Sequence, residues 1–286
     1  MDSAPFIPGI GHNEGLGQSF NFGCSMSRII AIANQKGGVG KTTTAVNLAA
    51  GLAASSKKVM LVDLDPQGNA TMASGIEKRE LEHSITELLL GESTLDQAIV
   101  ASEEGYDLIP CNIDLIAVEL QLMDASNREG RLKNALHPIR DKYDFIIIDC
   151  PPSLSLLTLN ALAAADGIIV PMQCEFFALE GLSSLINTIN ALKQKLNPAL
   201  EIDGIIRTMY DVRNNLANAV SNELTMHFGD TVFRTLVPRN IRLAEAPSHG
   251  MSIIRYDKGS RGALAYMGLS GEILQRMNKK SVKENL

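Results

Sequence analysis

The chain has 286 residues, of which 45% are hydrophobic and 20% charged, and its formal net charge is −6. This length and apolar content allow one full hydrophobic core, and we expect a single α/β domain rather than two small ones. The acidic balance excludes a protein that is basic over its whole surface. Any contact with nucleic acid must therefore come from a local basic patch.

The cysteines show no pattern of a metal site or a disulfide framework. They are Cys24, Cys111, Cys150 and Cys174, and no two of them form a CxxC pair. The absence of such a pattern favours a protein of the reducing cytoplasm. No apolar run reaches the roughly 20 residues that cross a bilayer, and the N-terminus lacks the pattern of a signal peptide. We expect a soluble, cytoplasmic protein.

The first part of the chain differs in composition from the rest. Residues 1–27 are rich in Gly, Ser and Asn and have no apolar periodicity, which predicts a flexible leader. Ordered structure is expected from residue 28 to residue 280, and residues 281–286 are expected to form a short tail.

Short β-branched runs alternate with longer helical patterns through the ordered part. The predicted strands are 29–33, 59–63, 106–109, 145–149, 167–171, 204–209 and 231–236. The predicted helices are 43–54, 131–140, 156–165, 179–196, 216–228 and 263–277. Several strands are apolar on consecutive residues, as in strands that are buried on both faces. The alternation predicts a doubly wound, mostly parallel sheet flanked by helices, with ligands at the carboxyl ends of its strands.

A glycine-rich segment follows the first predicted strand and opens the first predicted helix. It reads Lys36-Gly37-Gly38-Val39-Gly40-Lys41-Thr42-Thr43. Glycines let backbone N–H groups close on a phosphate chain, and a helix N-terminus adds partial positive charge. We assign the whole segment to nucleotide binding. Lys41 is expected to reach the β- and γ-phosphates and the Thr42 hydroxyl to bind Mg²⁺.

The segment departs from the ordinary GxxxxGK[ST] pattern in an informative way. Gln35 stands in place of the first glycine, and Lys36 adds a second lysine. The string KGGVGKTT resembles the deviant Walker A signature of the ParA/MinD class of P-loop ATPases. This resemblance implies an ATP-dependent dimer in which Lys36 of each subunit contacts the phosphates bound by the other. A cation supplied by the second subunit would couple dimerisation to the γ-phosphate.

Carboxylates end two of the predicted strands. Asp63 and Asp65 precede Pro66-Gln67-Gly68-Asn69, and together they resemble the DxDPQGN motif of the same class. We assign Asp65 to positioning the attacking water and Asp63 to the switch region, although either could simply cap the following turn. Asp149 ends a strand that resembles Walker B, and its carboxylate suits Mg²⁺ held directly or through water.

The C-terminal half contains a local excess of positive charge. Basic residues outnumber acidic ones by eight to five over residues 205–262, although the whole chain is acidic. DNA binding needs such a patch on an acidic protein. Solvated or salt-bridged arginines would give the same count.

One stretch of this region is very similar to chromosomal ParA (Soj) proteins. Pro238-Arg239-Asn240-Ile241-Arg242-Leu243-Ala244-Glu245-Ala246-Pro247-Ser248-His249-Gly250 matches their PRNxRLxEAPSxG pattern. The resemblance implies that Arg242 contacts DNA phosphates, as does Arg213 in the segment Asp211-Val212-Arg213-Asn214-Asn215-Leu216. It also implies that Pro238 and Asn240 lie at the adenine base.

The resemblance to ParA/Soj chromosome-partitioning ATPases covers residues 28–277. It implies a slow, switch-type ATP hydrolase that uses Mg²⁺, is associated with the nucleoid and dimerises on ATP. It further implies that the dimer binds double-stranded DNA without sequence specificity and that a ParB-like centromere-binding partner stimulates hydrolysis. The sequence is compatible with partition of either a chromosome or a plasmid.

Two other functions are compatible with the same phosphate loop. The first is a MinD-like, membrane-recruited positioning ATPase. The predicted last helix argues against it, because Gly268 and Gly271 interrupt that helix and Arg276 is its only basic residue. We expect this helix to pack within the domain and expect no membrane contact. The second is an enzyme that phosphorylates or ligates a small molecule, for which the sequence contains no distinct substrate motif.

Overall fold

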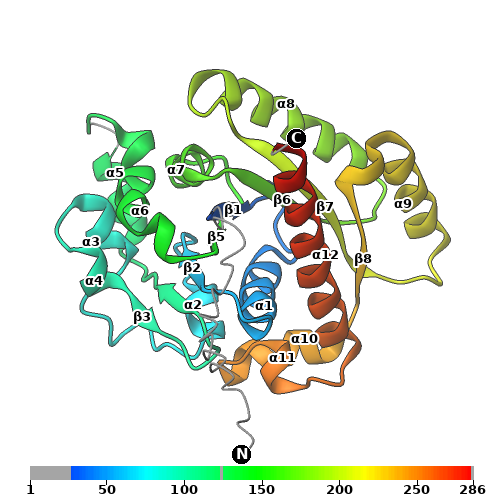
Figure 1. Ribbon diagram of the computed structural model, residues 1–286, viewed down its shortest axis with the longest axis horizontal. Helices are drawn as coiled ribbons and strands as arrows, with labels where there is room; N and C mark the ends of the chain where they lie inside the picture. Colours follow the sequence, from blue (N-terminus) through cyan, green and yellow to red (C-terminus); the bar gives the residue numbers. More distant parts are fainter. Residues whose placement is uncertain (1–26, 123–124, 285–286) are drawn as a thin grey trace, which may run out of the picture.

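The structure is a computed structural model that describes residues 27–122 and 125–284 (Figure 1). The predicted leader, 1–27, lies outside these residues apart from Ser27. Nearly all of the predicted ATPase domain lies within them.

An eight-stranded sheet forms the centre of the molecule. Its strand order is β3-β4-β2-β5-β1-β6-β7-β8, and all neighbouring strands are parallel except β3 and β4. The strands are β1 (Arg28–Ile32), β2 (Val59–Asp63), β3 (Val100–Ala101), β4 (Asp107–Ile109), β5 (Phe145–Asp149), β6 (Gly167–Gln173), β7 (Glu201–Tyr210) and β8 (Val232–Pro238). The predicted doubly wound, mostly parallel sheet is thus confirmed.

Helices cover both faces of the sheet. They are α1 (Lys41–Ala54), α2 (Asn69–Ala73), α3 (Ile85–Leu90), α4 (Leu95–Ala98), α5 (Leu115–Leu122), α6 (Arg131–Leu136), α7 (Leu156–Ala164), α8 (Ala178–Lys195), α9 (Asn215–Phe228), α10 (Ile241–Glu245), α11 (Ile253–Tyr256) and α12 (Arg261–Glu284). The 3₁₀ turns are η1 (Arg128–Gly130), η2 (His137–Lys142), η3 (Gly229–Thr231) and η4 (Ala246–His249).

The sheet divides the core into two layers because alternate residues of each strand point to opposite faces. Ile30 and Ile32 of β1 pack with α1 and α12, which lie side by side in Figure 1. Ile29 and Ala31 point the other way, toward the core that includes α7 and α8. Both layers are buried, which explains why the central strands are apolar on consecutive residues.

All seven predicted strands are present, with ends that differ by at most three residues. The predicted helix 131–140 is wrong in its second half, where α6 ends at Leu136 and η2 follows. Pro138 explains this, because proline has no N–H to donate and disfavours the α conformation of the preceding residue. The last helix continues to Glu284, beyond residue 280, where the tail was expected to begin; Gly268 and Gly271 do not interrupt it.

Candidate nucleotide-binding site

The phosphate loop leaves β1 at the point where the chain order of the sheet reverses. β1 has β5 on one side and β6 on the other, and open α/β sheets bind ligands at such a switch point. Gly38 and Gly40 have φ of +72° and +86°, a conformation that side chains disfavour. A Cβ built on Gly37 or Gly38 would meet no atom of the described residues within 4 Å, so the space beside these two glycines is not filled by the chain.

The loop ends as the N-terminus of α1. The first backbone hydrogen bond of this helix runs from Thr44 N–H to the Gly40 carbonyl, at 2.9 Å. The amides of Lys41, Thr42 and Thr43 therefore have no carbonyl of the preceding turn to bond. Such amides, with the positive end of the helix dipole, form an anion site.

Lys41 lies within this cradle and is buried. Its Nζ donates to the Lys36 carbonyl at 3.3 Å. Burial lowers the pKa of Lys41, and the nearby charges of Asp149 and Asp65 raise it. Lys41, Asp65 and Asp149 come from three separate segments of the chain and lie close enough for their charges to interact.

Asp149 is a buried carboxylate without a partner. Neither of its oxygens accepts a well-formed hydrogen bond from the described residues. Burial and the charges of Asp63 and Asp65 raise its pKa well above the usual range, while Thr42 and Lys41 favour the charged form. An unsatisfied carboxylate beside a threonine hydroxyl is the donor set that Mg²⁺ prefers, so Thr42 and Asp149 fit the predicted metal site.

The two acids after β2 play different parts. Asp63 is fully buried; its oxygens accept bonds from Thr71 N–H (2.8 Å), Thr71 Oγ1 (2.7 Å) and Asp65 N–H (3.2 Å). Burial raises its pKa to about 6. Asp65 is less enclosed, and one of its oxygens accepts from Gln67 N–H at 3.0 Å. Asp63 therefore fixes the loop, whereas Asp65 caps the turn with one oxygen.

Lys36 does not join the cluster around Lys41. Its side chain is 52% exposed, and its Nζ forms an ion pair with Glu175, which follows β6. The ammonium group thus lies at the surface of the loop.

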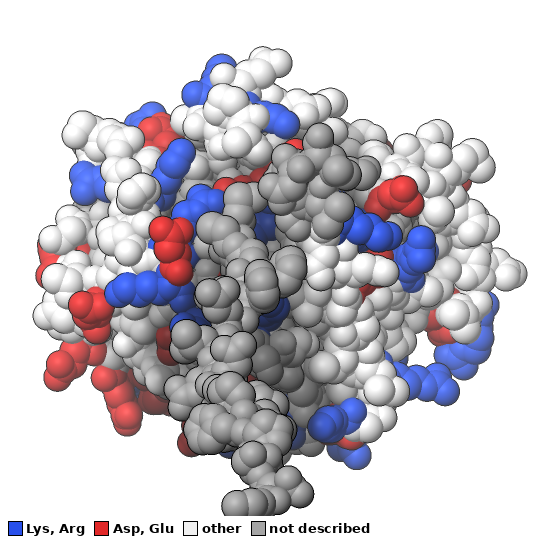
Figure 2. Space-filling view, in the orientation of Figure 1, with Lys and Arg blue, Asp and Glu red and all other residues white. Residues whose placement is uncertain are grey.

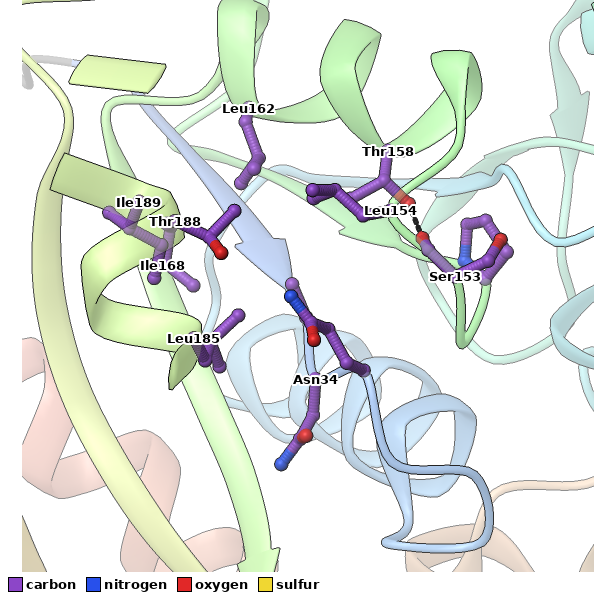
Figure 3. A pocket seen from close by; sticks show the side chains of 12 residues that line it. Asn34, Ser153, Leu154, Thr158, Leu162, Ile168, Leu185, Thr188 and Ile189 are labelled. Atoms are coloured by element: carbon purple, nitrogen blue, oxygen red, sulfur yellow. Dashed lines mark hydrogen bonds between the residues drawn. The ribbon is translucent and has the colours of Figure 1, made fainter. Parts of the chain in front are cut away.

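An apolar crevice lies behind the beginning of the loop (Figure 3). It is bounded by Asn34 at the end of β1, Leu154 and Thr158 near α7, and Leu185 and Ile189 of α8. The space at its centre is about 10 Å³, which holds one water molecule. A nucleotide cannot enter this crevice.

Pro238 and Asn240, the residues predicted at the adenine, lie at the edge of the sheet on the β8 side. Pro238 pairs in register with Tyr210 of β7. Asn240 caps α10, with its side-chain oxygen accepting from Arg242 N–H at 2.8 Å. One function of Asn240 is therefore structural.

Both predicted DNA-contacting arginines have carboxylate partners within the chain. Arg213 is 86% exposed and bonds both oxygens of Asp211, at 2.9 and 2.7 Å. Arg242 bonds Glu245 at 2.8 Å. Arg207, which contributes to the basic excess of this region, is buried and bonds Ser221 and the Phe233 carbonyl. The available positive charge is thus smaller than the count implies.

Charges of both signs are interspersed over the described part of the face seen in Figure 2. Among the described residues, no helix combines the length and the apolar character needed to span a bilayer. The predicted packing role of the last helix is confirmed: Ala263, Tyr266, Leu269 and Ile273 of α12 are buried against the α1 layer.

Known proteins that resemble this chain are consistent with a nucleotide-binding site. A family model described as "AAA domain" matches residues 27–202. A crystal structure described as cobyrinic acid a,c-diamide synthase from Mycobacterium smegmatis, with bound ADP and magnesium, is 38% identical with a TM-score of 0.78, covering 88% of this chain and 96% of that one. The fold, the loop and the buried carboxylate thus define a P-loop ATPase that uses ATP and Mg²⁺.

Relatives with similar sequences show which family of P-loop ATPases the chain belongs to. The sporulation initiation inhibitor protein Soj of Bacillus subtilis is 51% identical over 249 residues, covering 87% of this chain and 98% of the relative. The chromosome partitioning protein ParA of Myxococcus xanthus is 49% identical over 263 residues, covering 92% and 93%. The chain belongs to the ParA/Soj family of chromosome-partitioning ATPases and hydrolyses ATP.

Three residues that contact the loop were missed by the sequence analysis. They are Gln173, Glu175 and Thr208, which come from the ends of β6 and β7. All three are more than 130 positions from the loop in the chain, and no local pattern marks them. Only the strand order brings them there.

Proposed function

We propose that this chain is an ATP-dependent switch in DNA partitioning. Two copies bind face to face when each holds MgATP, and the dimer binds double-stranded DNA without regard to sequence. A ParB-like centromere-binding partner then stimulates slow hydrolysis, which returns the dimer to single subunits and releases the DNA. The ATP-bound form is thus associated with the nucleoid.

The position of Lys36 carries the dimer proposal. Lys41 already occupies the phosphate cradle of its own subunit, whereas Lys36 extends over the surface to Glu175. A surface ion pair of this kind contributes little to stability, so it is easily exchanged. In a second subunit placed against this surface, the bound phosphates would lie within reach of Lys36. The γ-phosphate adds negative charge, so it would favour Lys36 leaving Glu175 to bind the phosphates of the other subunit.

The remaining site residues divide the hydrolytic work. The loop amides and Lys41 hold the phosphates and balance their charge. Asp65, with one oxygen outside its turn bond, orients the attacking water. Thr42 and Asp149 hold Mg²⁺, which neutralises charge on the phosphate oxygens. Pro238 and Asn240 line the adenine.

DNA binding is proposed to use Arg213 and Arg242. Arg213 lies in the loop after β7 and Arg242 in α10, the short helix after β8; because β7 and β8 are neighbouring parallel strands, we place both arginines on one surface. To bind DNA, each arginine must exchange its carboxylate partner for a DNA phosphate. Such exchange makes binding weak for one subunit and favours a dimer, which doubles the number of contacts.

The proposal is tested by the binding of a fluorescent, random-sequence duplex followed by anisotropy. We expect salt-sensitive binding with MgATP and none with MgADP. Lys41→Ala abolishes it, Asp65→Ala retains or prolongs it, and Arg242→Glu weakens it. Arg79→Glu, which makes the same charge change at an exposed site outside residues 205–262, serves as the matched control and leaves binding unchanged.

Equal affinity with ADP and ATP would contradict the switch. A MinD-like protein would instead bind vesicles of anionic phospholipid with ATP and show no such DNA binding. The buried apolar face of α12 gives that alternative no support.

A further inference from the structure

Two strands that do not lead into the phosphate loop nevertheless contact its carbonyl groups. Thr208, near the end of β7, is 2% exposed, and its Oγ1 donates to the Val39 carbonyl at 2.8 Å. Gln173, at the end of β6, donates from Nε2 to the Gly38 carbonyl at 3.4 Å. β7 is separated from β1 by β6, so Thr208 reaches across a strand to make this bond.

These bonds determine which way the loop amides face. In a trans peptide unit the C=O of one residue and the N–H of the next point in opposite directions. Holding the Val39 carbonyl toward Thr208 therefore turns the Gly40 N–H away from β7, toward the inside of the loop. Holding the Gly38 carbonyl toward Gln173 does the same for the Val39 N–H.

The end of β7 is itself held in an unusual conformation. Met209 has φ of +49°, one of only three positive φ values at non-glycine positions in the described residues. Such a conformation costs about 1–3 kcal/mol and persists only where the surroundings enforce it. Around this irregular end of β7, the Thr208 methyl lies 3.8 Å from where a Gly40 Cβ would lie, and Gln173 contacts the Met209 sulfur.

We infer that Thr208, supported by Gln173, is a positioning residue for phosphate binding. It holds the loop with its amides turned inward before a nucleotide arrives, so binding does not have to order them. Val39 is buried, and without Thr208 its carbonyl would lose its partner and could rotate. This role concerns nucleotide binding alone and does not depend on DNA or on a dimer.

The test is the affinity of Thr208 variants for MgADP and Mg-ATPγS, measured by calorimetry. Thr208→Val keeps the shape and removes the donor, and we expect both nucleotides to bind about five- to tenfold more weakly, the effect of one lost hydrogen bond. Thr208→Ser restores the donor and should restore the affinity. Because ground and transition states lose the same contact, KM rises and kcat stays unchanged.

A matched control removes a similar bond far from the loop. Thr225 on α9 donates to the Ser221 carbonyl at 3.0 Å, and Thr225→Val should leave both affinities unchanged. If Thr208→Val fails to fold, Thr208→Ser and Thr208→Cys are compared instead. These two variants differ only in a hydroxyl oxygen or a thiol sulfur, and because the thiol is the weaker donor, Thr208→Cys should bind both nucleotides more weakly. Wild-type affinity in Thr208→Val, or in Thr208→Cys, would overturn the inference. So would a lowered melting temperature with unchanged affinity.

Discussion

Replacing Gly250 with alanine tests whether the segment that carries Arg242 rests on the turn after α2, the helix that follows the Asp65 loop. Gly75 lies just after α2 and Gly250 just after η4, and their backbones touch. A Cβ on Gly250 would lie 2.9 Å from the Gly75 Cα, closer than real Cβ contacts allow. Both glycines have positive φ, +80° and +62°.

Two costs add in this variant. Alanine in the left-handed conformation costs about 1–2 kcal/mol. The overlap with a backbone atom cannot be relieved by turning a side chain, and overpacking of this kind costs about 1–3 kcal/mol more. We expect Gly250→Ala to lower the free energy of unfolding by about 2–5 kcal/mol. Gly91→Ala is the matched control, because Gly91 has φ of +80° but open space around its Cβ, and it should cost about 1–2 kcal/mol.

Urea unfolding followed by circular dichroism measures both changes. Because the contact joins the turn after α2 to the turn after η4, in the segment that carries Arg242, Gly250→Ala should also weaken ATP-dependent DNA binding, whereas Gly91→Ala should not. If the two variants lost equal stability, the close contact would not exist in solution. If Gly250→Ala bound DNA normally, the contact would have no part in the switch.

Three further outcomes follow from the site. Asp149→Asn should abolish the stabilisation of the nucleotide complex by Mg²⁺ with little effect on the stability of the chain without nucleotide, since no well-formed hydrogen bond to the described residues is lost; a thermal shift with and without Mg²⁺ measures this, and retained Mg²⁺ dependence would contradict the assignment. Glu245→Gln removes the nearer carboxylate partner of Arg242 and leaves Asp257 at 3.7 Å, so it should raise DNA affinity at low salt in the anisotropy assay, whereas unchanged affinity would mean that the Glu245 ion pair does not compete with DNA. The pKa of Asp63 is about 6, above an unfolded value of about 3.9, so the folded chain binds more protons between these values. The contribution of Asp63 to stability should therefore fall as pH rises from about 4 to 6, so that Asp63→Asn loses less stability over this range than the wild type in urea titrations; the same pH dependence in both chains would contradict the assignment.

The sequence predicted the central sheet because its strands are long apolar runs with distinct ends. β3 has two residues and antiparallel pairing, and α2, α3, α4, α10 and α11 have four to six residues each. Such short elements complete too little of a period to show a pattern. Their positions depend on tertiary contacts, such as the bonds that Thr71 of α2 donates to Asp63.

The residues of the nucleotide site that were predictable lie in short sequence motifs next to predicted strands and helices. Lys41, Thr42 and Asp149 stand at the ends of predicted elements, and parallel strands bring such ends to one edge. Thr208 was not predictable, because it reaches the loop only through the strand order. The pairing of Arg242 with Glu245 was not predictable either, because it depends on α10, a helix too short to show a periodic pattern.

The proposed switch depends most on what ATP does to the association of two chains. Sedimentation equilibrium of Asp65→Ala in saturating MgATP measures this directly, because slow hydrolysis then preserves the complex. We predict a mass of twice the 30.9 kDa of one chain, and the mass of a single chain when Lys36→Ala is added to the same variant. A single-chain mass for Asp65→Ala with bound ATP, or a dimer unaffected by the loss of Lys36, would contradict it.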